Sequence, residues 1–305
     1  MADTLSDILQ RLDARSSVST GLLTGGDWAV EMQAFEGLKF NAMVRGEAWL
    51  AVADGGDPVR LGPGDAFILT RGSAFTMASA LDLPPLPAAK VFATPHNGVA
   101  RLGLAEDVFA IGGRMVLDPV DAELLLGALP ALIVLRAHSP AAQALGWLLE
   151  RLVSEVVTPQ PGGEAMKNHI VHMMFVEGLR AHLAAGAAQG WLGALTDRRI
   201  GQALSAIHAE PARRWTLPDL AHHAGMSRAN FALQFKAVIG LPPIDYITRW
   251  RMRLAAKALR QDSSTVSAIA LSLGYESEAA FSTAFRRHHG MPPSHYRRSL
   301  SRVAP

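Results

Sequence analysis

The chain has 305 residues, 49% of them hydrophobic, a length that exceeds one typical core and predicts two domains. It contains no cysteine, which excludes disulfides, thiolate metal sites and cysteine nucleophiles. Its formal net charge of +2 hides an asymmetry: residues 195–305 hold 16 Lys and Arg against 7 Asp and Glu, so a basic C-terminal part follows an acidic N-terminal part.

The first residues predict an amphipathic helix, and they lack the basic region and long apolar stretch of a secretion signal. Its apolar side is formed by Leu5, Ile8, Leu9 and Leu12. The most apolar window, Leu124–Leu135, is too short to span a membrane and is interrupted by Pro130. We therefore expect a soluble, cytoplasmic protein without membrane contact.

Between about residues 18 and 134, short apolar segments are separated by Gly, Pro and Asp, which is typical of a β-barrel or sandwich. Tight turns are predicted over 54–57 and 61–65. The predicted strands are Trp28–Phe35, Lys39–Val44, Ala48–Ala53, Ala66–Thr70, Phe75–Ala78 and Val108–Leu117.

The run F-N-A-M-V-R-G-E-A-W-L, the turn L-G-P-G-D and the following T-R-G-S resemble the cupin-type sensor domains that precede certain DNA-binding domains. The resemblance implies a cupin-like barrel over residues 1–136. Many cupins bind a metal through two or three His and a carboxylate. Here Asn41 and Phe75 stand where His would be expected, so we expect no metal and no cofactor. No Ser lies in a nucleophile-elbow or triad context either, which makes an enzyme the minor hypothesis.

Alternation along the predicted strands places several side chains together in the barrel interior. The predicted effector-binding residues are Asn41, Met43, Trp49, Phe67 and Phe75. Such a pocket would be mostly apolar with one amide, which suits a small organic effector. The alternative is that these aromatic side chains simply fill a small barrel.

Residues 137–186 predict a helical hairpin, with helices over Pro140–Val157 and Glu164–Ala185 joined by the turn P-Q-P-G-G. The Leu and Met stripes of these helices are typical of a core, although the resemblance also implies a possible homodimer through them. A linker over residues 187–195 follows.

The segment after the linker contains a repeat. Phe231, Phe235, Gly240, Pro242, Pro243 and Tyr246 recur fifty positions later as Phe281, Phe285, Gly290, Pro292, Pro293 and Tyr296. Each copy has a short helix ending at Gly, a tight turn and a second helix with one apolar face, which predicts a helix-turn-helix over 217–239 and another over 266–289. Thr216 with Asp219 resembles a capping box, and Ser227 caps the second helix.

The outward faces of the two second helices carry small side chains with basic residues at the margins, as major-groove binding requires. An all-helical bundle with solvated faces is the alternative reading. The predicted DNA-binding residues are Ser227, Arg228, Ala229, Asn230, Ala232, Leu233, Lys236, Ser277, Glu278, Ala279, Ser282, Thr283, Arg286 and Arg287.

These two copies, and above all the segment G-Y-E-S-E-A-A-F-S-T-A-F-R-R-H-H-G-M-P-P-S-H-Y-R, resemble the AraC/XylS family of transcriptional regulators. The resemblance implies an all-α DNA-binding domain over residues 196–300, with one long helix, Pro243–Arg260, joining the two units. Family members often carry Arg at the base-reading positions that Leu233 and Thr283 occupy here. We therefore expect thymine-methyl contacts and phosphate anchoring to count for more than Arg readout of guanine.

The sequence thus predicts an α+β protein of two domains that binds double-stranded DNA and regulates transcription in response to a small-molecule effector. The resemblance also implies RNA polymerase as a partner and an activator as the mode of action, although the sequence does not separate activation from repression. Two alternatives stay open: a constitutive regulator whose barrel serves only assembly, and a cupin enzyme tethered to DNA.

Overall fold

The computed structural model describes residues 15–18, 20–117, 126, 129–139, 142–186, 190–194, 197–261 and 264–301. They form two compact units, one mainly from residues 15–117 and 129–186 and one from residues 190–301. The predicted N-terminal helix and most of the apolar window before Leu132 lie outside the described residues. No helix within the described ranges is long and apolar enough to cross a membrane.

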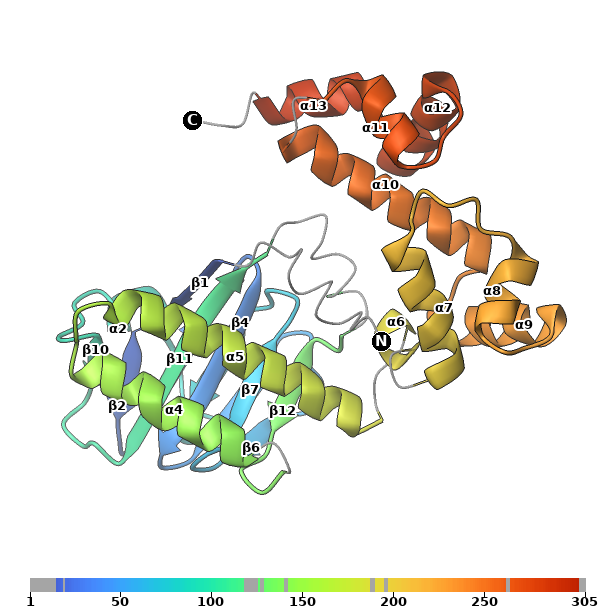
Figure 1. The fold of residues 1–305 in the computed structure, drawn as a ribbon. Coiled ribbons are helices and arrows are strands. Elements are labelled where there is room, and N and C mark those ends of the chain that lie inside the picture. The colour runs from blue at the N-terminus through green and yellow to red at the C-terminus, as the bar shows by residue number, and fades with distance from the viewer. Residues whose placement is uncertain are drawn as a thin grey trace. The chain divides into compact units, whose positions relative to one another are not determined.

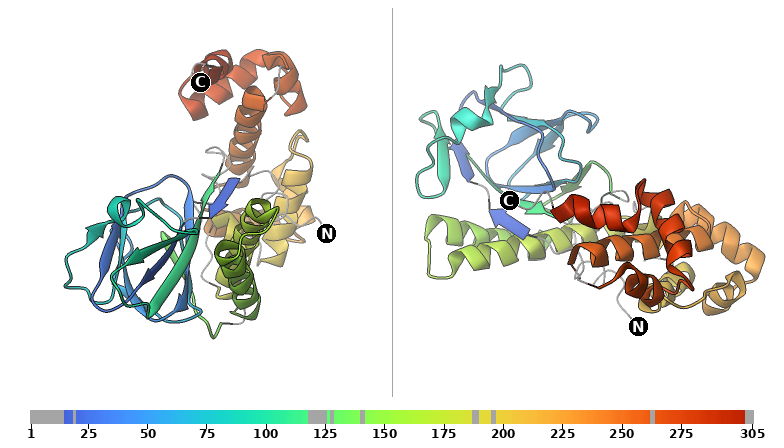
Figure 2. Two further views of the ribbon diagram at one scale, coloured as in Figure 1. Left: turned by 90° about the vertical axis from the view of Figure 1, so that its left-hand side faces the viewer. Right: turned by 90° about the horizontal axis from the view of Figure 1, so that it is seen from above.

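The first unit contains two β-sheets that face each other (Figures 1 and 2). One sheet has the order β10-β2-β11-β4-β7-β12, with β1 added to β11. Its strands are β1 (Arg15–Val18), β2 (Gly21–Thr24), β4 (Leu38–Arg45), β7 (Ala66–Leu69), β10 (Val99–Leu102), β11 (Val108–Val116) and β12 (Leu132–Leu135).

The second sheet has the order β6-β5-β8-β3-β9, and a short helix, α2 (Ala88–Val91), follows its last strand. Its strands are β3 (Ala29–Met32), β5 (Ala48–Val52), β6 (Val59–Leu61), β8 (Phe75–Ala78) and β9 (Leu86–Pro87). All six strands predicted from the sequence are therefore present: β8 has the predicted bounds, and the other five differ at one or both ends.

Side-chain alternation divides the larger sheet into two buried faces. On β4, Asn41 and Met43 face the interior between the sheets, and their neighbours Phe40 and Ala42 face the opposite side. That opposite side is covered by a helical hairpin, α4 (Ala142–Val157) and α5 (Gly163–Ala184), as Figure 1 shows. Because Gly178 of α5 lies against Ile68 of β7, a Cβ at position 178 would overlap the Ile68 side chain.

The hairpin leucines are accounted for within this unit. Leu145, Leu148, Leu149 and Leu152 of α4 are all buried, as are Ile170, Met174 and Leu179 of α5. The Leu stripe is therefore core, which is the first of the two readings that the sequence allows. Met173 of α5, by contrast, is exposed.

The second unit is all helical, and Figure 1 shows the two repeated motifs near opposite ends of one long helix. The helices are α6 (Gly190–Ala194), α7 (Arg198–Ala209), α8 (Leu217–His223), α9 (Arg228–Ile239), α10 (Pro243–Gln261), α11 (Val266–Ser272), α12 (Glu278–His289) and α13 (Pro293–Ser301). The predicted joining helix corresponds to α10. Helices α7 and α13, which the sequence analysis did not specify, flank the two motifs.

Candidate DNA interface and effector cavity

Helix caps define both helix-turn-helix units. Thr216 and Asp219 form the predicted capping box at the start of α8, and the Ser227 hydroxyl accepts a hydrogen bond from the Asn230 N–H at the start of α9. Hydrogen bonds from Thr216 hold the pKa of Asp219 below its usual value. In the second helix-turn-helix motif, Thr265 and Ser277 cap α11 and α12 in the same way.

The second helix of each motif is anchored by two phenylalanines. Phe231 and Phe235 of α9, and Phe281 and Phe285 of α12, are completely buried. Both helices end at a glycine in the left-handed conformation, Gly240 with φ 83° and Gly290 with φ 75°. Because α9 and α12 have their buried phenylalanines and their C-terminal glycine at equivalent positions, both helices turn corresponding residues outward.

The predicted DNA-binding residues lie on or directly before α9 and α12. All of them are exposed except Ala232 and Ser282, which are half-buried at the edge of that face. Leu233 is 72% exposed, so its side chain is available to a partner on this face. The Thr283 hydroxyl donates to the Ala279 carbonyl at 2.9 Å, so its methyl group and a lone pair are available to a partner.

The two motifs are joined by Arg251 of α10 as well as by the helix itself. Its guanidinium donates to the carbonyls of Pro211 and Arg213, at 2.7 and 2.8 Å, in the loop before α8. The same guanidinium lies 5.8 Å from the ring of Tyr275, in the turn of the second motif. Gly274 (φ 78°) packs directly on the Ala212 carbonyl, where a Cβ would collide with the oxygen. The loop before the first motif therefore contacts the turn of the second motif.

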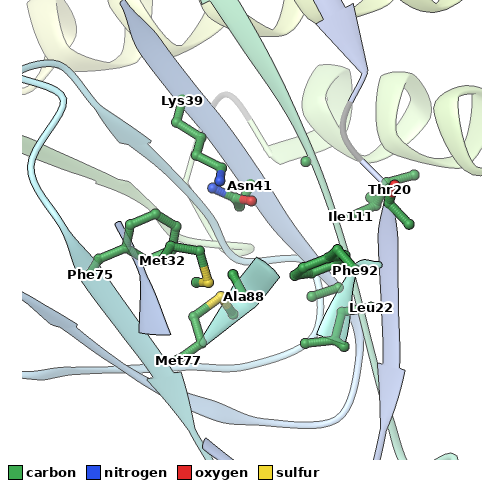
Figure 3. Close-up of a pocket in the computed structure, with 12 residues that line it drawn as sticks. Thr20, Leu22, Met32, Lys39, Asn41, Phe75, Met77, Ala88, Phe92 and Ile111 are labelled. Atoms are coloured by element: carbon green, nitrogen blue, oxygen red, sulfur yellow. The ribbon is translucent and has the colours of Figure 1, made fainter. Parts of the chain in front are cut away.

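A cavity of about 360 Å³ opens between the two sheets of the first unit, as Figure 3 shows. Its walls are mainly apolar, from Leu22, Met32, Phe75, Met77, Phe92 and Ala110. Polar groups come from Thr20, Lys39 and Asn41. Among the described residues, the buried Asn41 amide nitrogen has no hydrogen-bond partner.

The structure brings some of the predicted effector residues together. Asn41 and Phe75 line the cavity, and Phe67 packs edge-on against Phe75 with ring centroids 5.8 Å apart. Met43 and Phe67 are fully buried in the surrounding core.

The prediction that Trp49 shares this interior is wrong. On β5, Leu50 pairs with Met77 and Val52 with Phe75, so these residues share the cavity face. Trp49 pairs with Ala78 and points to the other face of the sheet. The pairing of β5 with β8 determines which face of β5 is directed to the cavity, and the sequence of β5 alone does not show this pairing.

Lys39 is the charged lining residue of the cavity that sequence reasoning missed. It lies two positions before Asn41 on β4, so strand alternation already placed it on the same face. Its ammonium is 5.1 Å from the ring centroid of Phe75 and 5.7 Å from that of Phe35. Burial lowers the pKa of Lys39, and the positive charge of Arg114 lowers it further.

The donor set does not fit a cupin metal centre. Nowhere among the described residues do three His, Asp or Glu side chains gather closely enough to hold an ion. The cavity walls themselves carry an amide, an ammonium and a hydroxyl, and neither His nor carboxylate.

Two helix-turn-helix units on one long helix, together with a cupin-like barrel that encloses a cavity, define a DNA-binding protein with a separate sensor-type domain. Comparison with known proteins agrees: a family profile described as cupin matches residues 3–184, and one described as helix-turn-helix domain matches residues 220–299. An AraC-like transcription regulator of Streptomyces lividans is 41% identical over 97% of this chain and 98% of its own. The chain belongs to the AraC family of transcription regulators.

Two further similarities are more distant. The HTH-type transcriptional regulator AlkR of Acinetobacter baylyi is 30% identical over 97% of this chain and 99% of its own. The DNA-binding domain of AdpA, solved in complex with a target DNA, is 25% identical and matches 34% of this chain and 94% of its own, with a TM-score of 0.33.

Proposed function

We propose that this regulator binds DNA through the outward faces of α9 and α12 in two successive major grooves, and that a small organic effector in the barrel cavity controls it. The observation that supports the DNA interface most directly is the equivalent phase of the two helices, each held by two fully buried phenylalanines and each ending at a left-handed glycine. A helix reads base edges only when it enters the groove at a defined angle, which such anchoring supplies.

The proposed contacts fall into two groups. Lys236, Arg286 and Arg287 are exposed at the margins and bind phosphates. The other predicted residues of α9 and α12 face the bases, with Leu233 and Thr283 presenting apolar groups to thymine methyls. Acidic Glu278 lies in the first turn of α12 among these residues, where it would accept from an exocyclic amine rather than bind phosphate.

Nuclease footprinting tests this interface. Two protected tracts per protomer, about 34 Å or one helical turn apart, are expected. Arg251→Met removes the hydrogen bonds to the loop before α8 and keeps much of the side-chain volume, so the protection of the two tracts should become unequal or shifted in phase. A single short tract with the wild-type protein would contradict the proposal.

For the barrel we propose a sensor without a metal and without catalysis. The support is the apolar cavity with its unpartnered Asn41 amide. Asn41→Ala should abolish the response of transcription to the effector and leave DNA affinity intact, while Trp49→Ala, on the other face of β5, is the matched control that should respond normally. Stoichiometric zinc or iron by elemental analysis would overturn the proposal.

The remaining elements of the proposed function rest on membership of the family. We propose that the protein acts in the cytoplasm as a homodimer and contacts RNA polymerase as an activator. The exposed Trp147 of α4, with Met166 and Met173 of α5, gives the hairpin an apolar outer surface that a second copy could cover. Sedimentation of the wild-type protein and of Trp147→Ser tests the dimer, since the variant should shift the equilibrium toward monomer.

A further inference from the structure

We infer that the effector is a small organic acid, whose carboxylate binds Lys39 and Asn41 and whose apolar body fills the cavity between the sheets. This inference rests on the proposed sensor function of the barrel and narrows the chemistry of its ligand.

The first observation is the placement of two hydrogen-bond donors on one strand. Lys39 and Asn41 occupy alternate positions of β4, so both side chains enter the same cavity, and Figure 3 shows the Lys39 side chain running toward Asn41. The Asn41 amide nitrogen has no hydrogen-bond partner in the part of the chain that the structure describes. An ammonium and an amide N–H together match the two oxygens of a carboxylate.

The second observation is the charge balance around Lys39. No carboxylate of the described residues forms an ion pair with it, and none lines the cavity. Arg114 of β11, which pairs with Lys39 across the sheet, is also positive and lowers the pKa of Lys39. Its guanidinium is directed to the Glu36 carbonyl at 2.8 Å and lies 3.9 Å from the exposed Glu36 carboxylate. The cavity therefore carries an excess of positive charge.

The unpaired charge of Lys39 has an energetic cost. A partly buried ammonium without an anionic partner destabilises the folded protein, and the two aromatic rings beside Lys39 compensate only in part. A carboxylate that enters the cavity recovers the missing interaction, so a charged ligand gains more than a neutral one of the same shape. Gly112 contributes as well, because a Cβ at this position would occupy the space of the Asn41 amide.

Cavity size and walls define the rest of the ligand. A volume of about 360 Å³ lies near the small end of ligand pockets, which span about 300–1,000 Å³. Met32, Met77 and Phe92 provide flexible and aromatic surface. The walls outside the Lys39 region carry one further polar side chain, Thr20, so the body of the acid should be a compact hydrocarbon or single aromatic system.

The test is thermal unfolding of the full-length protein with matched pairs of probes: octanoate against octanamide, benzoate against benzamide, and naphthoate against naphthamide. We expect at least one acid to raise the unfolding temperature and its amide to bind about 10- to 100-fold more weakly, as expected for loss of a charged hydrogen bond. Lys39→Met should abolish that difference. The exposed Lys90→Met, next to the cavity on α2 but outside its walls, is the matched control and should behave as wild type.

A second readout separates ligand binding from a structural role. Without ligand, Lys39→Met should unfold at a higher temperature than wild type, because it removes an unpaired charge and retains an apolar side chain of similar length. Lower stability of Lys39→Met, stabilisation by none of the acids, or equal stabilisation by acid and amide would each overturn the inference. None of these outcomes alters the footprint on DNA, which tests the proposed regulator by itself.

Discussion

The two helix-turn-helix units share their buried residues and differ in their exposed ones. Phe231 and Phe235 correspond to Phe281 and Phe285, all fully buried, and Tyr246 corresponds to Tyr296. At the surface, Leu233 and Lys236 of α9 correspond to Thr283 and Arg286 of α12, and Arg287 adds a further charge. Packing therefore determines where each helix lies. The exposed residues are not constrained by this packing and can differ between the two motifs.

The interior polar groups also differ between the two halves. In the first, His208 of α7 stacks on Trp250 at 4.1 Å and its Nε2 lies 2.7 Å from the Tyr246 hydroxyl, whose pKa is raised by burial. In the second, His289 of α12 packs against Phe285 and Tyr296, with ring centroids 4.4 and 5.5 Å apart. A histidine from a different helix therefore contacts the shared tyrosine in each copy.

The largest effects should come from the shared phenylalanines. Phe231→Ala and Phe281→Ala each create a cavity in a fully buried site and should lower the free energy of unfolding by about 3–5 kcal/mol. Denaturant unfolding of the full-length protein measures this, and footprinting should show loss of the first tract in one variant and of the second in the other. Equal loss of both tracts in both variants would mean that the two halves fold as one unit.

The turn glycines should respond unequally. Gly225 (φ 61°) has open space around its Cα, so Gly225→Ala should cost only the strain of a left-handed residue, about 1–2 kcal/mol. Gly274 has a similar φ but lies against the Ala212 carbonyl, so Gly274→Ala should cost about 2–5 kcal/mol and disturb the spacing of the two motifs. Similar unfolding midpoints for the two variants would show that the contact between the motifs is unimportant.

The charged margins should act on all DNA sequences alike. Lys236→Ala, Arg286→Ala and Arg287→Ala should each reduce the slope of log affinity against log salt by about one unit. Because α12 carries two of the three charges, the double variant Arg286→Ala/Arg287→Ala should lose about twice the slope of Lys236→Ala. Titrations on operator and random DNA at several salt concentrations decide this, and a changed base preference in Arg286→Ala would contradict its assignment to phosphate.

The smallest effects, and the most specific, should come from Leu233 and Thr283. Leu233→Ala should weaken operator binding about 3- to 10-fold and leave random DNA unaffected, because it removes an apolar contact to a thymine methyl. Thr283→Val keeps the methyl group and should bind nearly as wild type, whereas Thr283→Ala should resemble Leu233→Ala. Selection of preferred sites from random DNA would show which base each position reads, and unchanged preferences in both alanine variants would refute this role.

The repeat in the sequence was sufficient to predict the DNA-binding unit. The period of fifty residues identifies the two copies. The glycines at the turns and the capping residues Thr216 and Ser227 are local signals, since they act on the backbone within one or two helical turns. They predicted α8, α9, α10 and α12 with small errors at the ends. Strand alternation likewise placed Asn41 and Met43 on one face of β4, because the period of two is a property of the strand itself.

What the sequence alone did not determine depends on pairing between distant segments. Whether Trp49 or Leu50 faces the cavity follows from the register of β5 against β8, and a shift of one residue exchanges the two faces. The excess charge at Lys39 became apparent only when the chain had placed Phe35, Phe75 and Arg114 around it without a carboxylate. The contact of Gly274 with Ala212 joins the turn of the second motif to the loop before the first. Local propensity specifies the elements, but only the packed structure specifies which side chains meet.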